Sequence, residues 1–161
     1  MVKVYVASPL GFSLATKSFY ETEVLDKVRA AGFDPLDPWE DPQADREFEK
    51  ALELPVSEAR QNTLRAINTR LAAKNTANIE QADALLAILD GTDVDSGTAA
   101  EIGFAAALKK PIVGLRLDKR QAGDNEGAKV NMQVEWFMGS GDHLVFSMND
   151  AIRLLGSLTG P

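Results

Sequence analysis

The chain has 161 residues and a hydrophobic fraction of 45%, which is enough for one domain with a substantial core. Its formal net charge of −7 at pH 7 argues against partners that present phosphates, such as a nucleic-acid backbone or an anionic membrane surface. Cysteine is absent and histidine occurs once, at His143, which excludes a disulfide framework, a thiol nucleophile and a His-rich zinc site. We expect one domain over residues 1–161, no cofactor, and a cytoplasmic protein without a leader peptide or membrane span.

Five short apolar runs have the length and composition of buried β-strands. They lie at residues 3–7, 33–36, 84–89, 111–115 and 143–146. Helical patterns separate these runs, and strands that alternate with helices form a parallel sheet covered on both faces. Five strands suit a flavodoxin-like order, 2-1-3-4-5, in which ligands bind in the crevice between the first and third strands. We therefore predict an α/β fold of this kind.

The helical segments begin with residues that are typical of helix caps, among them Ser13, Ser57 and Ser147. We expect helices over residues 13–31, 43–52, 57–82, 99–108 and 147–158. The apolar spacing predicts that the inner face of the first helix consists of Phe19, Val24, Leu25 and Val28. Residues 118–129 are polar and predict a mobile loop, whereas residues 130–138 are amphipathic without a clear helix or strand period.

The most informative segment is an acidic loop between the third strand and the following helix. It consists of Asp90-Gly-Thr-Asp-Val-Asp-Ser-Gly-Thr-Ala-Ala-Glu101-Ile-Gly-Phe104. Glu101 is expected about one turn inside the helix, where the helix dipole keeps a carboxylate ionised, and Asp95 lies in the loop before it. Gly97 lacks a side chain and lets a ligand come close. Because ligands bind at the carboxyl ends of parallel strands, the two carboxylates are a candidate reactive centre.

The same loop has other interpretations. Thr98-Ala-Ala-Glu101 fits a capping box, with Thr98 as N-cap and Glu101 folded back onto the Thr98 amide, and this structural role stays open. A calcium loop does not fit, because Thr98 stands where it requires glycine and Phe104 where it requires its closing glutamate.

Two carboxylates without a neighbouring cysteine, histidine or metal ligand limit the possible chemistry. Displacement at the anomeric carbon of a sugar needs one ionised carboxylate beneath the ring and an acid beside the leaving group. Glu101 is the natural nucleophile for such a reaction, and Asp95 or a nearby acid could move the proton of the leaving base.

Several further segments occur along most of the chain in a characteristic order. They are Val4-Tyr-Val-Ala-Ser-Pro9, Pro35-Leu-Asp37, Asn75 upstream of Ala82-Asp83, Asp95-Ser-Gly-Thr-Ala-Ala-Glu101-Ile-Gly103 and Val130-Asn131-Met132. With these segments the chain resembles the nucleoside 2-deoxyribosyltransferases, and the D-x-G-x-x-x-E-x-G loop is the most specific of them. The resemblance implies an enzyme that acts on 2′-deoxynucleosides and free nucleobases and moves 2-deoxyribose between bases in a ping-pong reaction.

The resemblance also implies a role for individual residues. Glu101 matches the nucleophile that attacks C1′, expels the base and holds a covalent deoxyribosyl-enzyme. Asp95 matches the acid that contacts the base and moves its proton, and Tyr5 matches a tyrosine whose hydroxyl holds the nucleophile. Asn131 matches an asparagine that reaches across a subunit interface to the sugar 5′-hydroxyl, so the resemblance implies a homo-oligomer.

The remaining expected substrate-binding residues include departures from the family pattern. Asn75 stands where many members have an aspartate near the base, and because an amide cannot act as a general acid, that role shifts towards Asp95. Trp39 stands where some members have a glutamine that contacts the base. The family sequence Asn-Leu-Met is here Asn131-Met132-Gln133. The full expected substrate-binding set is Pro9, Trp39, Asn75, Gly97, Asn131 and Gln133.

Structural interpretations of these residues stay open. Tyr5 can be a core aromatic with a satisfied hydroxyl, and Trp39 can cover the edge of the sheet or stack on a base. Asn75 can be a solvated helix position, and Asn131 can cap the next segment. His143 is expected to be structural.

Two other functions also stay open. The first is hydrolysis of deoxynucleoside 5′-monophosphates, in which water replaces the acceptor base. Its first loop would need donors for the phosphate, and Ser8-Pro-Leu-Gly-Phe-Ser13 has hydroxyls but no arginine, which favours a free 5′-hydroxyl. The second is a nucleotide-sensing module without catalysis on the same fold.

Overall fold

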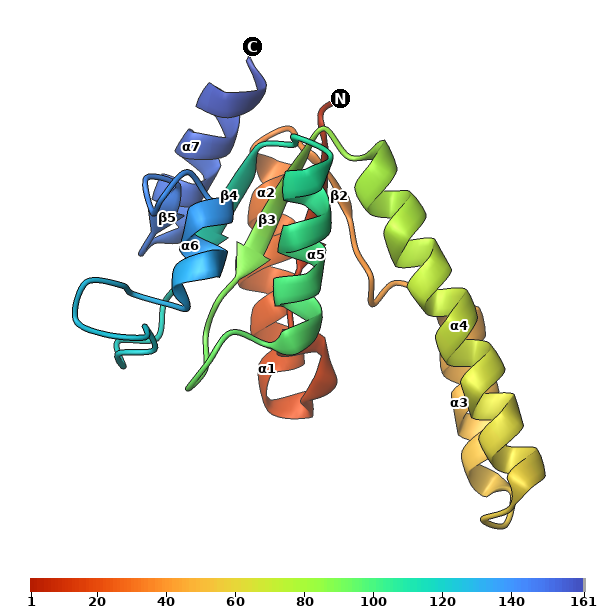
Figure 1. Cartoon of the computed structure of the whole chain (residues 1–161). Helices are drawn as coiled ribbons and strands as arrows, with labels where there is room; N and C mark the ends of the chain where they lie inside the picture. The colour runs from red at the N-terminus through yellow and green to blue at the C-terminus, as the bar shows by residue number, and fades with distance from the viewer. Residues whose placement is uncertain (161) are drawn as a thin grey trace.

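The structure, a computed structural model, describes residues 1–160 and contains a parallel sheet (Figure 1). The sheet has the order β2-β1-β3-β4-β5, as the alternating pattern predicted. Its strands are β1 (Lys3–Ala7), β2 (Asp34–Leu36), β3 (Ala84–Ile88), β4 (Ile112–Leu115) and β5 (Leu144–Val145). Each strand lies within the apolar run that predicted it, because a buried parallel strand needs apolar side chains on both faces.

The helices follow the predicted segments, with one irregularity in the first. They are α1 (Leu14–Phe19), α2 (Asp26–Ala30), α3 (Pro42–Glu53), α4 (Glu58–Gln81), α5 (Ser96–Ala107), α6 (Met132–Phe137) and α7 (Met148–Thr159). A π-helical turn over Tyr20–Leu25 joins α1 to α2, and a short 3₁₀ turn covers Leu10–Phe12. The ambiguous segment 130–138 is therefore helical, and residues 118–129 have neither helix nor strand.

The π-helical turn explains one wrong prediction. Phe19 was expected on the inner face, but it is 41% exposed, and Tyr20 is buried in its place at 1%. A π turn closes i→i+5 hydrogen bonds and so adds a residue to one turn of the helix, which shifts the inward face. Val24, Leu25 and Val28 are buried as predicted.

Alternate side chains of the strands pack on opposite faces of the sheet. Val4 and Val6 of β1 lie in an apolar cluster with residues of α2 and α7, whereas Tyr5 and Ala7 lie in a second cluster with residues of α5 and α6. Figure 1 shows α5 on one face of the sheet and α1 and α2 on the other. The two clusters pack on both faces of the central strands. The residues at the carboxyl edge of the sheet are therefore held in fixed positions.

The helices α3 and α4 form an arm that extends away from the sheet (Figure 1). The arm has a separate small apolar cluster of Ala44, Ala51 and Ile67, against which Phe48, Leu64 and Leu71 pack. Leu52, Leu54 and Val56 at its tip are exposed. Only the C-terminal end of α4 packs on the main core, through Ile79 and Ala82. The arm is therefore anchored to the body at one end.

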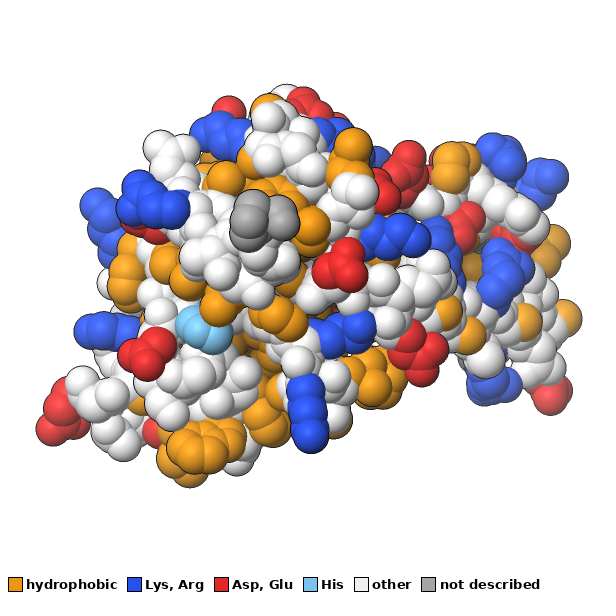
Figure 2. All heavy atoms as spheres, turned by 90° about the horizontal axis from the view of Figure 1, so that it is seen from above, with side chains coloured by type: hydrophobic (Ala, Val, Ile, Leu, Met, Phe, Trp, Pro, Cys, Tyr) orange, Lys and Arg blue, Asp and Glu red, His pale blue; other side chains and the backbone are white. Residues whose placement is uncertain are grey.

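The face seen from above mixes basic and acidic side chains without a continuous basic area (Figure 2). This agrees with the negative net charge of −7. Among residues 1–160, no helix combines the length and the apolar character that crossing a bilayer requires.

Candidate active site

The loop after β3 leads directly into α5, and Asp95 is its N-cap. Asp95 Oδ2 accepts a hydrogen bond from the Thr98 backbone N–H at 3.0 Å. The capping-box interpretation is therefore wrong, because Asp95 already supplies the capping bond and the helix begins at Ser96. Glu101 consequently lies in the second turn, further from the helix start than predicted, and its carboxylate does not fold back onto Thr98.

The Glu101 carboxylate instead contacts β1. The Tyr5 hydroxyl donates to Glu101 Oε1 at 2.6 Å, across 96 positions of the sequence. Tyr5 is fully buried in β1, between β2 and β3, so its hydroxyl is held in place by the core. One carboxylate oxygen is thus oriented by a fixed donor, and Oε2 makes no hydrogen bond within residues 1–160.

Burial is the main cause of the shifted pKa values of Glu101 and Tyr5. Burial raises the pKa of Glu101 above its usual value, the Tyr5 hydrogen bond opposes that rise, and the negative charge of Asp95 adds to it. Burial and the adjacent Glu101 charge raise the pKa of Tyr5 far above its usual value. Tyr5 therefore stays a neutral hydrogen-bond donor, and an ionised Glu101 is a desolvated, more basic carboxylate than an exposed one.

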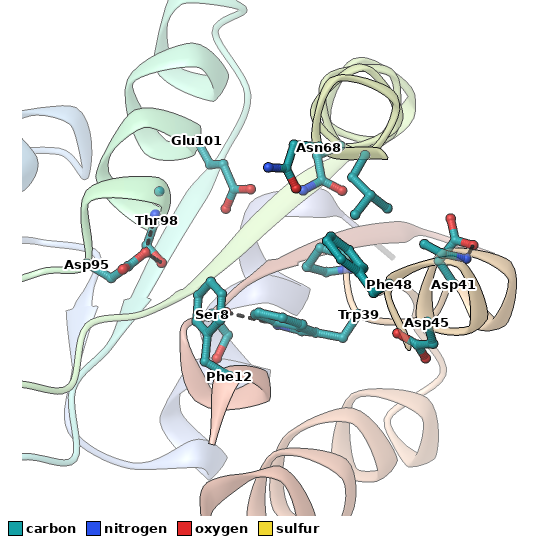
Figure 3. Close-up of a pocket in the computed structure, with 15 residues that line it drawn as sticks. Ser8, Phe12, Trp39, Asp41, Asp45, Phe48, Asn68, Asp95, Thr98 and Glu101 are labelled. Carbon is teal, nitrogen blue, oxygen red and sulfur yellow. Dashed lines mark hydrogen bonds between the residues drawn. The ribbon is translucent and has the colours of Figure 1, made fainter. Parts of the chain in front are cut away.

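Glu101 faces a cavity of about 470 Å³ between the sheet and the arm (Figure 3). The sheet side of the cavity is lined by Ser8, Asp95, Gly97, Thr98 and Glu101. The loops after β1 and β2 contribute Phe12, Pro38 and Trp39. The start and body of the arm contribute Asp41, Ala44, Asp45, Phe48, Asn68, Leu71 and Asn75. Cavities of roughly 300–1,000 Å³ with apolar walls and a few polar groups are typical of small-molecule sites.

Trp39 forms a fixed aromatic wall of this cavity. Its indole N–H donates to the Ser8 carbonyl at 3.0 Å, and its backbone N–H donates to Asp37 Oδ1 at 3.0 Å. The Phe12 ring meets it edge to face with centroids 4.4 Å apart. A Cβ atom at Gly11 would lie 2.3 Å from the indole, so only glycine fits there. Trp39 therefore presents a rigid flat surface to a ligand.

The cavity is acidic. Its lining includes the carboxylates of Asp41, Asp45, Asp95 and Glu101 and no lysine, arginine or histidine. Lys74 approaches from behind and pairs with Asp41 Oδ2 at 3.1 Å. Among residues 1–160, no cluster of three or more histidine, aspartate or glutamate residues is arranged to hold a metal ion. The lining thus suits an uncharged polar ligand better than a phosphate.

Two sets of hydrogen bonds hold the start of the acidic loop against the segment that follows β4. The buried Arg116 guanidinium donates to the carbonyls of Leu89, just before this loop, of Gly91 within it, and of Arg120. In return, Asp90 Oδ1 accepts from the backbone N–H groups of Leu117 and Asp118, which follow β4, at 2.6 and 2.9 Å. We did not expect Arg116 from the sequence, because an arginine after a strand gives no sign of being buried.

The expected site residues fall into two groups. Trp39, Asn75, Gly97, Asp95 and Glu101 line the cavity, and Tyr5 lies directly behind Glu101. Pro9 does not line it; its carbonyl accepts from the Phe12 N–H in the 3₁₀ turn.

Asn131 and Gln133 lie elsewhere in the chain. Asn131 caps α6, with its Oδ1 accepting from the Gln133 N–H at 3.0 Å, so its structural role as a cap is confirmed. Neither residue lines the cavity of its own chain. His143 is in hydrogen-bonding distance of the Ile112 carbonyl, at 3.1 Å, and supports the β4–β5 edge.

Several cavity residues were missed in the sequence. Asp45, Phe48 and Asn68 come from the arm, whose position depends on packing and not on a motif. A partial sign was available on α4, where Asn68, Leu71 and Asn75 follow the i, i+3, i+7 spacing of one helix face. A helix face that packs in an apolar core rarely has two asparagines beside a leucine. This face therefore indicates a cavity with polar groups in its wall.

The fold and the cavity define a flavodoxin-like α/β protein with a carboxylate-centred site at the carboxyl edge of its sheet. The sequence model of the nucleoside 2-deoxyribosyltransferases matches residues 4–135, and the chain belongs to this family. Family membership points to an enzyme that acts on nucleosides. No curated protein sequence matches the chain.

Solved structures support the same fold. A conserved protein from Enterococcus faecalis V583 is 26% identical with a TM-score of 0.67, and 98% of each chain is covered. The 2-desoxiribosyltransferase from Leishmania mexicana is 21% identical with a TM-score of 0.67, again with 98% of each chain covered. The 2-deoxyribosyltransferase from Bacillus psychrosaccharolyticus is 21% identical with a TM-score of 0.59, covering 94% of this chain and 90% of that one.

Proposed function

We propose that this protein transfers 2-deoxyribose between nucleobases through a covalent ester on Glu101. The observation that supports this most is the buried Glu101 carboxylate, which faces the cavity and is oriented by the Tyr5 hydroxyl at 2.6 Å. A desolvated carboxylate with one free oxygen is suited to attack an anomeric carbon. Its position on a helix that packs against the sheet keeps that oxygen fixed relative to a bound sugar.

In the first half-reaction, Glu101 Oε2 bonds to C1′ and the C1′–N bond breaks. Its electron pair passes to the base nitrogen, which takes a proton from the carboxyl of Asp95. In the second half-reaction, a nitrogen of another base attacks C1′, the ester bond breaks, and the proton of the incoming base returns to Asp95. Tyr5 donates to Glu101 while it is ionised and so lowers the energy of the free carboxylate.

The cavity walls supply the binding surface for the base. The indole of Trp39, with the rings of Phe12 and Phe48, offers flat apolar faces for stacking. Such stacking accepts any nucleobase, because every base has a π-face. The absence of a cationic side chain among the lining residues favours a free 5′-hydroxyl over a 5′-phosphate. This supports transfer from nucleosides in preference to cleavage of nucleoside monophosphates.

The direct test is chromatography of 2′-deoxyinosine incubated with the protein, with and without adenine. Transfer predicts 2′-deoxyadenosine only when adenine is present, and Glu101→Ala should abolish it while the protein stays folded. Hypoxanthine release at an equal rate in both tubes would assign a hydrolase instead. Unchanged turnover in Glu101→Ala would exclude the covalent mechanism.

We also propose that the active protein is a homo-oligomer in which Asn131 serves the site of a neighbouring subunit. Asn131 lies outside the cavity of its own chain, so a contact with the sugar requires a second copy. Co-expression of Asn131→Ala with Glu101→Ala tests this, because a mixed oligomer contains some sites with both residues intact. Recovery of transfer above either variant alone supports a shared site, and no recovery contradicts it.

A further inference from the structure

Asn75 differs from every other polar side chain in the described part of the chain. Its Oδ1 is the one buried side-chain nitrogen or oxygen atom of residues 1–160 that has no hydrogen-bond partner. Its Nδ2 makes no hydrogen bond within residues 1–160 either. Buried polar groups in folded proteins are nearly always paired, so an unpaired amide in a cavity wall indicates that a ligand supplies its partner.

Asn75 is placed to meet the ligand that Glu101 meets. It lies on the face of α4 that lines the cavity with Asn68 and Leu71, and Trp39 lines the same cavity. Figure 3 shows α4 end-on, with Asn68 and Glu101 pointing into the same cavity. A base that stacks in this cavity while its sugar is at Glu101 therefore has an edge within reach of the α4 face.

No hydrogen bond within residues 1–160 fixes the orientation of this amide. The terminal torsion of an asparagine is broad and nearly two-fold, so a half turn exchanges the oxygen and the nitrogen with little change of shape. The amide of Asn131, by contrast, is held: its Oδ1 accepts from the Gln133 N–H at 3.0 Å. At Asn75, a bound ligand decides which end of the amide faces it.

Nucleobases present two opposite hydrogen-bond patterns on their pairing edges. Adenine and cytosine place an amino donor beside a ring-nitrogen acceptor, whereas hypoxanthine, guanine, thymine and uracil place an oxo acceptor beside a ring N–H donor. An amide has one donor and one acceptor side by side, so it matches either pattern after a half turn. A carboxylate in the same place accepts only, and it repels an oxo group.

We propose that Asn75 is a specificity-determining residue whose rotating amide lets the site take both amino and oxo bases. This rests on the proposed function in that the cavity holds a nucleobase. In one orientation Oδ1 accepts from the amino group and Nδ2 donates to the ring nitrogen. In the other, Nδ2 donates to the oxo group and Oδ1 accepts from the ring N–H. The buried atom gains its partner in both cases.

The test compares kcat/KM for 2′-deoxyadenosine and 2′-deoxyinosine in Asn75→Asp and in the wild type. The ratio between the two substrates should shift by about tenfold or more towards 2′-deoxyadenosine, since a site that leaves polar groups unpaired discriminates strongly. Asn68→Asp is the control for an added charge alone, because Asn68 also lines the cavity but is exposed and so has no buried unpaired atom. We expect its ratio to stay that of the wild type. An unchanged ratio in Asn75→Asp, or an equal shift in both variants, would overturn the proposal.

A second variant and a binding experiment separate this proposal from the proposed function. Asn75→Leu keeps the volume and should lower kcat/KM for both substrates without changing their ratio; a changed ratio would overturn the proposal. Calorimetry of adenine and hypoxanthine with Glu101→Ala, with and without Asn75→Asp, measures base selectivity without catalysis. If the wild type shows no exchange, the proposed function fails, and the calorimetric ratio still decides the role of Asn75. An unchanged ratio there would overturn that role.

Discussion

The body of the molecule and its arm hold the two sides of the cavity in different ways. In the body, two large apolar clusters pack the sheet from both faces and fix Tyr5 against Glu101. In the arm, three buried residues form the centre of a small cluster, and ion pairs such as Arg70–Glu47 complete it. The carboxylate that we propose as the nucleophile thus lies on the rigid part, and the α4 wall that we propose to contact the edge of the base lies on the lightly packed part. We infer that the arm is the region that can adapt to different bases.

A matched pair of truncations gives the largest expected effect and tests this contrast directly. Ile88 in β3 is 1% exposed and Ile67 in the arm is 3% exposed, so Ile88→Ala and Ile67→Ala remove the same group from equally buried sites. Ile88→Ala should lower the free energy of unfolding by about 4 kcal/mol, and Ile67→Ala by about 2 kcal/mol, because the small arm cluster can relax into the space. Denaturant titration measures both.

The two truncations, Ile88→Ala and Ile67→Ala, should also differ in their effects on KM. Ile67→Ala loosens the arm wall that we propose to contact the base, so it should raise KM more than it lowers kcat. Ile88→Ala at a temperature where it stays folded should leave KM close to that of the wild type. Equal losses of stability with equal rises in KM would show that the arm and the body act as one unit.

The next largest effect is expected for Tyr5→Phe. The hydroxyl orients Glu101 and, in the second half-reaction, stabilises the carboxylate as it leaves C1′, so its loss should lower kcat by about ten- to a hundredfold. Because the Tyr5 hydroxyl lowers the pKa of Glu101, its removal raises that pKa further, and the acidic limb of the rate profile moves to higher pH. A pH series of kcat/KM checks this; a fall in rate without a shift of the limb would place Tyr5 outside the control of Glu101 ionisation.

A smaller effect is expected on the stability of Glu101→Gln. Burial raises the folded-state pKa of Glu101, so its ionisation opposes folding above that pKa, whereas below the unfolded value of 4.5 the penalty is absent. Glu101→Gln should therefore melt at a higher temperature than the wild type at pH 7, and the difference should shrink as the pH falls towards 4. A lower melting temperature of Glu101→Gln at pH 7 would contradict the conclusion that the buried, ionised Glu101 lowers stability in exchange for activity.

The smallest effect is expected in the arm for Glu47→Gln. The Arg70 guanidinium lies 2.5 Å from Glu47 and lowers the pKa of that exposed carboxyl, so the pair stabilises the arm at neutral pH and loses this contribution as the pH falls through the lowered pKa. Because the pair is exposed, the change in melting temperature should be small and should vanish in 1 M salt. A large, salt-independent loss would mean that ion pairs, and not the apolar cluster, hold the arm together.

The sequence alone determined the sheet, most helix boundaries and the position of the acidic loop. Each of these depends on neighbours in the chain: apolar runs predict buried strands, a serine such as Ser57 or Ser147 caps the helix that follows, and the Asp95–Glu101 spacing marks the carboxyl end of β3. Even here a local ambiguity misled us, because Asp95 and Thr98 are both good caps and only the packed helix shows which one is used.

The tertiary structure alone decided the cavity and the groups that line it. The Tyr5–Glu101 bond joins residues 96 positions apart, and the wall opposite comes from an arm that no motif places. Arg116 is buried, and Asn75 Oδ1 is buried without a hydrogen-bond partner, because segments distant in the sequence pack around them. Burial and hydrogen-bond pairing depend on what lies beside a group in space, and the sequence around a residue does not contain that information.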